Sequence, residues 1–123
     1  MSVFGKSQGH FRAFIEVFPC GSKTRIKPAV NGIRWSFVYA EDVEGVGPEG
    51  ASQNDIWPEF LDDAGASLAK DVPLIGEFNA IMHIVSASMV DAHFQRLKEG
   101  TEFYCMEGLR KVAKGHVTDL SVN

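Results

Sequence analysis

Two arginines occupy positions that suit anion binding. Arg34 and Arg110 each lie beside a glycine-containing turn, and a guanidinium binds a carboxylate or phosphate through two parallel hydrogen bonds. Lys23, Arg25 and Lys27 lie together in one predicted hairpin and extend the same chemistry, and Thr24 between the first two is a further candidate binding residue. The alternative is that these side chains bridge strands or bond turn carbonyls within the fold. The sequence leaves both interpretations open.

A second candidate contact lies in an acidic stretch. Residues 41–63 contain eight acids and no Lys or Arg, and they include three glycines and two prolines. This composition predicts a long exposed loop. Within it, Trp57 and Phe60 are predicted to contact a partner, because large apolar side chains are seldom left in water. The alternative is that they pin the loop to the rest of the fold.

Catalytic and metal-binding patterns are missing from the sequence. The four histidines and two cysteines show neither metal-ligand spacing nor a CxxC pair, so we expect no metal and no other cofactor. Neither a phosphate-binding GxxxxGK[ST] loop nor a GxSxG elbow occurs. The neighbouring acids Glu41-Asp42 and Asp62-Asp63 lie in the predicted loop, where a fixed acid–base separation is hard to hold. We therefore expect a protein without catalytic residues.

Composition indicates one ordinary domain over residues 1–123. Hydrophobic residues make up 45% and charged residues 23% of the chain, which is typical of a globular protein. The net charge of -4 argues against a broad nucleic-acid surface, although residues 1–34 hold six of the twelve Lys and Arg residues against one acid. With two isolated cysteines and no apolar run of membrane-spanning length, we expect a cytoplasmic protein that makes no membrane contact.

Alternating apolar residues and turn signals predict a mainly β domain. Strands are expected at residues 11–17, 34–39, 77–85, 103–106 and 112–120, with a turn at 107–110 and at most one short helix, at about 89–98. Short strands joined by frequent turns favour a small closed barrel or a sandwich.

The order of four motifs resembles the third, C-terminal domain of elongation factor Tu, in the translation GTPase family. The first strand is similar to the family's F-x-A-x-V-x-V run, Gly21-Ser22-Lys23-Thr24 to its G-R-H-T hairpin, and Gly32 to Phe37 to its G-Y-R-P-Q-F. The most specific stretch, Glu107-Gly108-Leu109-Arg110 with the residues that follow, resembles E-G-G-R-T-V-G-x-G-x-V. Together the motifs span nearly the whole chain.

This resemblance implies a six-stranded antiparallel Greek-key barrel that stands alone, without the GTPase domain. In the family, parts of these loops touch the transfer RNA backbone. Here the family's Pro is Trp35, its Gln is Ser36, and its hairpin Arg and His are Ser22 and Lys23. These departures put RNA binding in doubt.

Three functions therefore remain open. The first is a protein-binding module without catalysis that uses Trp57, Phe60 and the acidic loop. The second is an accessory of translation that binds transfer RNA or another RNA through Lys23, Arg25, Arg34 and Arg110. The third is a small-molecule site at the mouth of the barrel. The sequence does not fix the oligomeric state.

Overall fold

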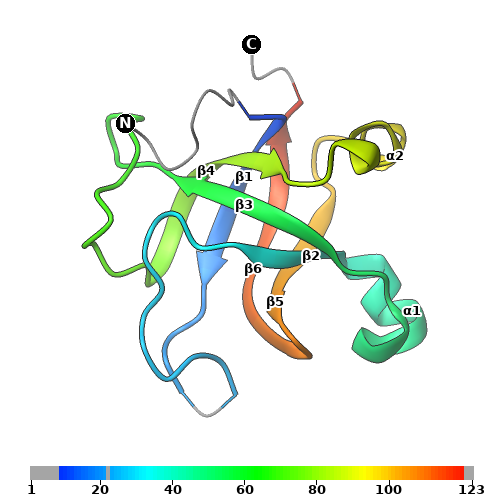
Figure 1. Ribbon diagram of the computed structural model, residues 1–123, viewed down its shortest axis with the longest axis horizontal. Coiled ribbons are helices and arrows are strands. Elements are labelled where there is room, and N and C mark those ends of the chain that lie inside the picture. The colour runs from blue at the N-terminus through cyan, green and yellow to red at the C-terminus, as the bar shows by residue number, and fades with distance from the viewer. Residues whose placement is uncertain (1–8, 22, 121–123) are drawn as a thin grey trace.

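The computed structural model describes residues 9–21 and 23–120. Six strands close into one antiparallel barrel, which confirms the predicted fold class. Their bounds are β1 Phe11–Val17, β2 Trp35–Tyr39, β3 Asn54–Phe60, β4 Gly76–Ile84, β5 Glu102–Glu107 and β6 Arg110–Asp119. Around the barrel the strands follow the order β1-β4-β3-β2-β5-β6. Because β2, β3 and β4 are consecutive neighbours and β1 returns beside β4, the arrangement is a Greek key (Figure 1).

Period-two alternation fills the barrel with apolar side chains. In β1, Phe11, Ala13, Ile15 and Val17 are buried while the residues between them are half-buried or exposed. Their partners across the interior come from each of the other five strands. The buried set includes Phe37, Phe60, Met82, Phe103 and Val112. The alternation that predicted the strands from sequence therefore also builds the core.

The described part of the chain contains two α-helices, where the sequence predicted at most one short helix. The predicted helix at about 89–98 corresponds to α2, Val90–Arg96, preceded by a 3₁₀ turn at Ala87–Met89. The unpredicted helix is α1, Ala40–Gly50, which breaks at Gly47 where φ is 80°. Its glycines, Pro48 and acids are typical of a loop, but Ala40 and Val43 are buried, and Val43 packs against Val38 and Met106. Tertiary burial thus overrides a weak local helix preference.

The predicted acidic loop at 41–63 is wrong for a second reason, because it also contains β3. This strand places Ile56, Pro58 and Phe60 inward and Asp55, Trp57 and Glu59 outward. A proline normally argues against a central strand. At Pro58, however, β3 pairs only with β4, since its pairing with β2 covers only residues 54–56. The missing N–H is tolerated where, among the described residues, only one side of the strand pairs with another strand.

One end of the barrel gathers the segments that carry the predicted anion-binding residues. The long β1–β2 connection, residues 18–34, and the tight β5–β6 turn lie at the same end (Figure 1). Buried Asn31 fastens the connection, because its side-chain amide donates to the carbonyls of Phe60 and Leu68 and its oxygen accepts from the Phe60 N–H. No helix among the described residues is long and apolar enough to cross a membrane.

Candidate functional site

A basic surface covers this end of the barrel. We define it by Lys23, Arg25, Ile26 and Lys27 of the β1–β2 connection and by Leu109 and Arg110 of the β5–β6 turn. Ile26 is 85% exposed and Leu109 56% exposed, although both are large aliphatic residues. Four of the six residues are cations. The surface therefore combines positive charge with two uncovered apolar side chains.

Glu107 joins the two segments that make the basic surface. Its carboxylate forms an ion pair with Arg25 and accepts a hydrogen bond from Trp35 Nε1 at 2.8 Å. The Arg110 guanidinium lies 3.7 Å from the same carboxylate. Arg25 also donates from Nε to the Lys27 carbonyl at 3.0 Å. One carboxylate thus fixes two guanidinium groups, while Lys23 and Lys27 form no ion pair with any described residue.

An open depression of about 350 Å³ lies within this surface. It is lined by Arg25, Ile26, Lys27, Glu107 and Arg110. Three cations face one carboxylate here, so an excess of positive charge remains for an incoming anion. The exposed Ile26 side chain gives the same depression an apolar wall.

The structure brings together some of the predicted binding residues and separates others. Lys23, Arg25 and Arg110 belong to the basic surface. Thr24 lies between them, but its hydroxyl donates to the Pro19 carbonyl at 2.6 Å and so shapes the loop. Ile26, Leu109 and Glu107 were not predicted as site residues. Of these three residues, only Ile26 has a signal in the sequence, because it is an aliphatic residue between the two cations Arg25 and Lys27 in a polar loop.

Arg34, Trp57 and Phe60 do not line the depression in the basic surface. The Arg34 guanidinium carbon is 4.6 Å from the Trp57 ring centroid, an internal cation–π contact. Trp57 is half-buried on the outer side of β3, and its Nε1 donates to the Gly32 carbonyl at 2.7 Å. Phe60 is fully buried in the core, so its predicted role in partner contact is wrong. The prediction that a partner docks on an exposed loop around Trp57 loses its structural basis.

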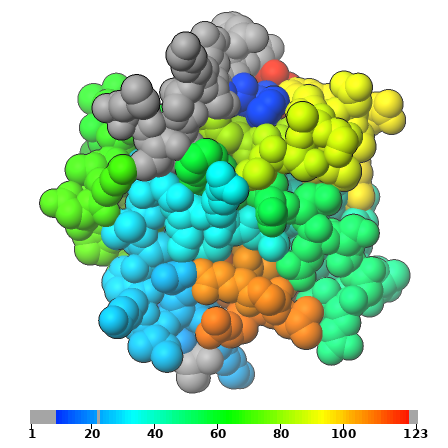
Figure 2. All heavy atoms as spheres, viewed as in Figure 1, coloured from blue at the N-terminus to red at the C-terminus, as the bar shows by residue number. Residues whose placement is uncertain are grey.

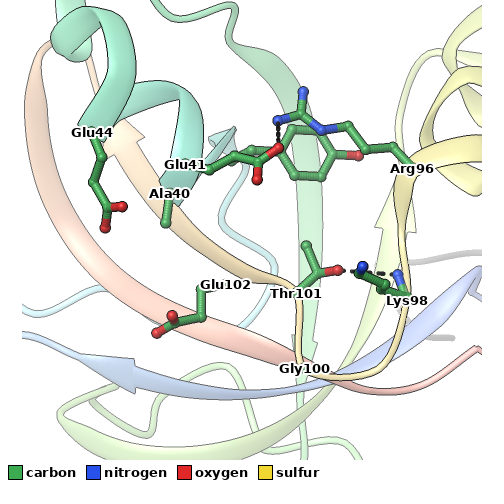
Figure 3. A pocket seen from close by; sticks show the side chains of 9 residues that line it. Ala40, Glu41, Glu44, Arg96, Lys98, Gly100, Thr101 and Glu102 are labelled. Atoms are coloured by element: carbon green, nitrogen blue, oxygen red, sulfur yellow. Dashed lines mark hydrogen bonds and ion pairs between the residues drawn. The ribbon is translucent and has the colours of Figure 1, made fainter.

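A second, polar cavity of about 330 Å³ lies between α1 and the segment after α2. Its lining includes Glu41, Glu44, Arg96, Lys98 and Glu102, and Figure 3 shows the Glu44 and Glu102 carboxylates facing the same space. On one side of this cavity, the Arg96 side chain is bound by two carboxylates. The guanidinium donates two hydrogen bonds to Asp42, at 2.6 and 3.0 Å, and one to Glu41 at 2.8 Å.

Behind Arg96 lies a buried tyrosine–histidine pair. The Tyr39 hydroxyl and His93 Nδ1 are 2.7 Å apart, and the Arg96 guanidinium carbon lies 3.7 Å from the centre of the Tyr39 ring. Burial raises the pKa of Tyr39 to about 12, so its hydroxyl stays neutral. Burial and the nearby Arg96 charge lower the pKa of His93. Since His93 does not line the cavity, the pair ties α2 to the barrel rather than facing a ligand.

This pair predicts acid sensitivity. Because the pKa of His93 is lower in the folded chain, the unfolded chain binds more protons as pH falls below 6.5, the ordinary histidine value. The free energy of unfolding is therefore expected to fall between pH 6.5 and the folded pKa. His10, whose pKa burial also lowers, contributes to the same slope. Urea unfolding at a series of pH values should show a flatter slope for His93→Gln, which keeps a neutral acceptor for Tyr39, and an unchanged slope for Gln95→Ala on the same helix. An unaltered slope in His93→Gln would contradict the assignment.

The remaining reactive side chains of the described residues are the two cysteines and the groups that could bind a metal ion. Within residues 9–21 and 23–120, no three His, Cys, Asp or Glu side chains are placed to hold a metal ion together. Cys105 is buried, and burial raises the pKa of its thiol, which keeps it protonated and inert. Cys20 is exposed in the β1–β2 connection.

No protein-family model and no curated protein matches the chain. A small Greek-key barrel is shared by unrelated proteins with different functions, so the fold alone does not identify a relative. The likeness to the third domain of elongation factor Tu remains a prediction from sequence motifs. Functional inference must come from the basic surface itself.

Proposed function

We propose that this protein is a cytoplasmic, non-catalytic binding module whose basic surface docks an acidic segment of a partner protein. The observation that carries the proposal is the exposure of Ile26 and Leu109, at 85% and 56%, among Lys23, Arg25, Lys27 and Arg110. Exposed apolar side chains that lie together with cations are typical of protein interfaces. The partner segment is expected to carry carboxylates beside a large aliphatic side chain.

The same composition favours a protein over RNA as partner. Phosphate binding uses cations, and binding of single-stranded RNA adds aromatic side chains on which the bases stack. The basic surface contributes two aliphatic side chains instead, and neither recognises a phosphate. An acidic peptide with a leucine or isoleucine uses both the cations and the aliphatic residues. RNA binding as an accessory of translation remains the second candidate, because the cations alone suit it.

The third hypothesis, a small-molecule site in the barrel, has less support. Large side chains fill the interior, including Phe11, Phe37, Phe60 and Phe103, which are each exposed by 1% or less. The two openings described above are lined mainly by charged and polar side chains. Neither resembles the apolar pockets that bury most of a small ligand.

The test is fluorescence anisotropy with a labelled peptide of alternating Glu and Leu, and in parallel with labelled poly(U). Lys23→Glu with Lys27→Glu is expected to weaken peptide binding more than tenfold, since both lysines are exposed and free of ion pairs with described residues. Ile26→Ser is expected to cost about tenfold for the peptide, roughly the loss of a partly buried aliphatic side chain. Lys70→Glu, an exposed cation elsewhere, is the matched control.

The two ligands separate the candidate functions. If Ile26→Ser weakens binding of the peptide and leaves binding of poly(U) unchanged, the protein-binding proposal is supported. If poly(U) binds more tightly than the peptide and Ile26→Ser changes neither, the RNA candidate replaces it. If the wild-type protein binds no acidic peptide at low salt, the proposal is wrong.

A further inference from the structure

The basic surface continues into an acidic one on the same face of the molecule. Figure 2 shows the β1–β2 connection in light blue, the β5–β6 turn in orange and α1 in blue-green, side by side with the turn in the middle. Two contacts confirm this adjacency: Arg25 of the connection pairs with Glu107 at the turn, and Gln53, just after α1, donates to the Gly108 carbonyl at 3.1 Å. The face therefore runs from basic through the turn to acidic.

The α1 side of this face is negatively charged and partly apolar. Residues 40–55 contain five acids and no Lys or Arg. Arg96 binds Glu41 and Asp42, and Glu44 lines the polar cavity, whereas Glu49 is exposed and forms no ion pair with a described residue. Val46, three positions before Glu49, is 64% exposed. α1 is thus an acidic segment with an exposed aliphatic residue, the chemistry that the proposed function assigns to the partner.

A face with this order is complementary to itself. When two copies meet face to face about a twofold axis that passes along the turn, the basic side of each copy lies over the acidic side of the other. Because Leu109 lies in the turn, its two copies then come near the axis. Within one chain the turn separates α1 from the basic connection, so this pairing requires a second molecule.

From this arrangement we infer that the protein forms a symmetric dimer through this face, with α1 of each copy docked on the basic surface of the other. The inference rests on the proposed function and names a second copy of this chain as one acidic partner. It also implies regulation by concentration. At low concentration the basic surface is free for other acidic partners, and dimerisation covers it.

Sedimentation equilibrium across micromolar to millimolar concentrations tests the dimer directly. The mass is expected to rise from the 13.5 kDa monomer toward twice that value, and 0.5 M NaCl is expected to shift the transition to higher concentration. Leu109→Glu, in an exposed turn outside the core, places two carboxylates near the axis and is expected to give a monomer at every concentration. Glu77→Lys with Glu99→Lys, two exposed acids outside this face, is the matched control.

A charge exchange gives the sharper test. Lys23→Glu with Lys27→Glu places acids against acids in a homodimer, and Glu49→Lys places a base against bases, so each variant alone is expected to be monomeric. Mixed in equal amounts, the two variants restore opposite charges at both halves of the interface, and the heterodimer is expected to form. Thermal unfolding followed by circular dichroism checks that each variant is folded.

The outcomes distinguish the dimer from the proposed function. A wild-type protein that stays monomeric at all concentrations overturns the dimer, as does a mixture of the two folded charge variants that stays monomeric. Binding of the labelled peptide to such a monomer would leave the proposed function standing. A dimer whose charge variants recover on mixing, in a protein that never binds the peptide, would support the inference and remove the outside partner.

Discussion

Phe37→Ala is expected to lower the free energy of unfolding by about 3–5 kcal/mol, the cost of removing a buried aromatic ring that the neighbours cannot replace. The Phe37 ring is stacked on Phe103 with centroids 4.7 Å apart, and it makes edge contacts with Phe11, Tyr39 and His93. Its removal therefore opens a cavity among residues of β1, β2, β5 and α2. Such a loss is a large fraction of the free energy of unfolding of a domain of this size.

Chemical denaturation followed by tryptophan fluorescence measures this loss, because Trp35 lies buried on the same strand. Phe94→Ala is the matched control, since Phe94 is 38% exposed on α2 and should change stability far less. Phe37→Leu should fall between the two, as it refills part of the cavity. A loss below about 1 kcal/mol for Phe37→Ala would show that the aromatic cluster is not the core of the barrel.

The sequence predicted the strands in which apolar residues alternate or follow one another between turn signals. Residues 11–17 are the clearest example, because every second residue is apolar and the strand pairs on both sides. β3 was not predicted, because the acids Asp55 and Glu59 and the proline at position 58 are atypical of a strand. The inward side chains Ile56, Pro58 and Phe60 form an alternating pattern only when the strand is paired with β4. Local composition cannot show that one side of a strand will have no partner where a proline falls.

Helix α1 is a second element that local sequence patterns did not predict. Three glycines and a proline within residues 40–50 are typical of a loop. The segment becomes helical because Val43 is buried against β2 and β5, and because Arg96, more than fifty positions away, binds the acids of its first turn. Those partners are distant in sequence, so no local pattern reveals them.

For the candidate site, the sequence located the cations but not their organisation. Arg25 and Arg110 were predicted from glycine turns and charge, yet the predictions placed Arg34 with them and assigned partner contact to Trp57 and Phe60. The missing element is Glu107, which connects two loops separated by 82 positions. A single acid in a turn carries no signal that it will collect two arginines and the indole N–H of Trp35.

Asn31 carries the other large predicted effect, because it holds the basic surface in place. The Asn31-Gly32 pair indicated a turn, and the structure adds three hydrogen bonds between the Asn31 side chain and the backbone: two buried ones to Phe60 and a partly buried one to Leu68. Asn31→Ala leaves the N–H and carbonyl of Phe60 without these partners. The expected loss in the free energy of unfolding is about 2–4 kcal/mol, the cost of unpaired buried polar groups.

Asn31→Ala is also expected to weaken binding of the labelled peptide severalfold under conditions where the variant is fully folded. Asn31 fastens the connection that carries Lys23, Arg25 and Ile26 to β3, so its loss lets that connection sample more conformations and raises the entropy cost of binding. Asn31→Asp separates shape from hydrogen bonding, since a carboxylate accepts from the Phe60 N–H but donates to neither carbonyl. It should be destabilised as well, while Asn79→Ala, at an exposed position on β4, should change neither property.

Stability and binding together decide what Asn31 does. If Asn31→Ala loses stability and the folded fraction binds the peptide as tightly as the wild type, Asn31 supports the barrel, and the basic surface holds its shape through other contacts, such as the Arg25–Glu107 pair and the Ala29–Leu74 bridge. If both fall together, the recognition surface depends on a hydrogen bond network anchored in the core, and the loop is preorganised for its partner. We expect the second result, because the buried amide and the ion pair fix two different points of the same connection.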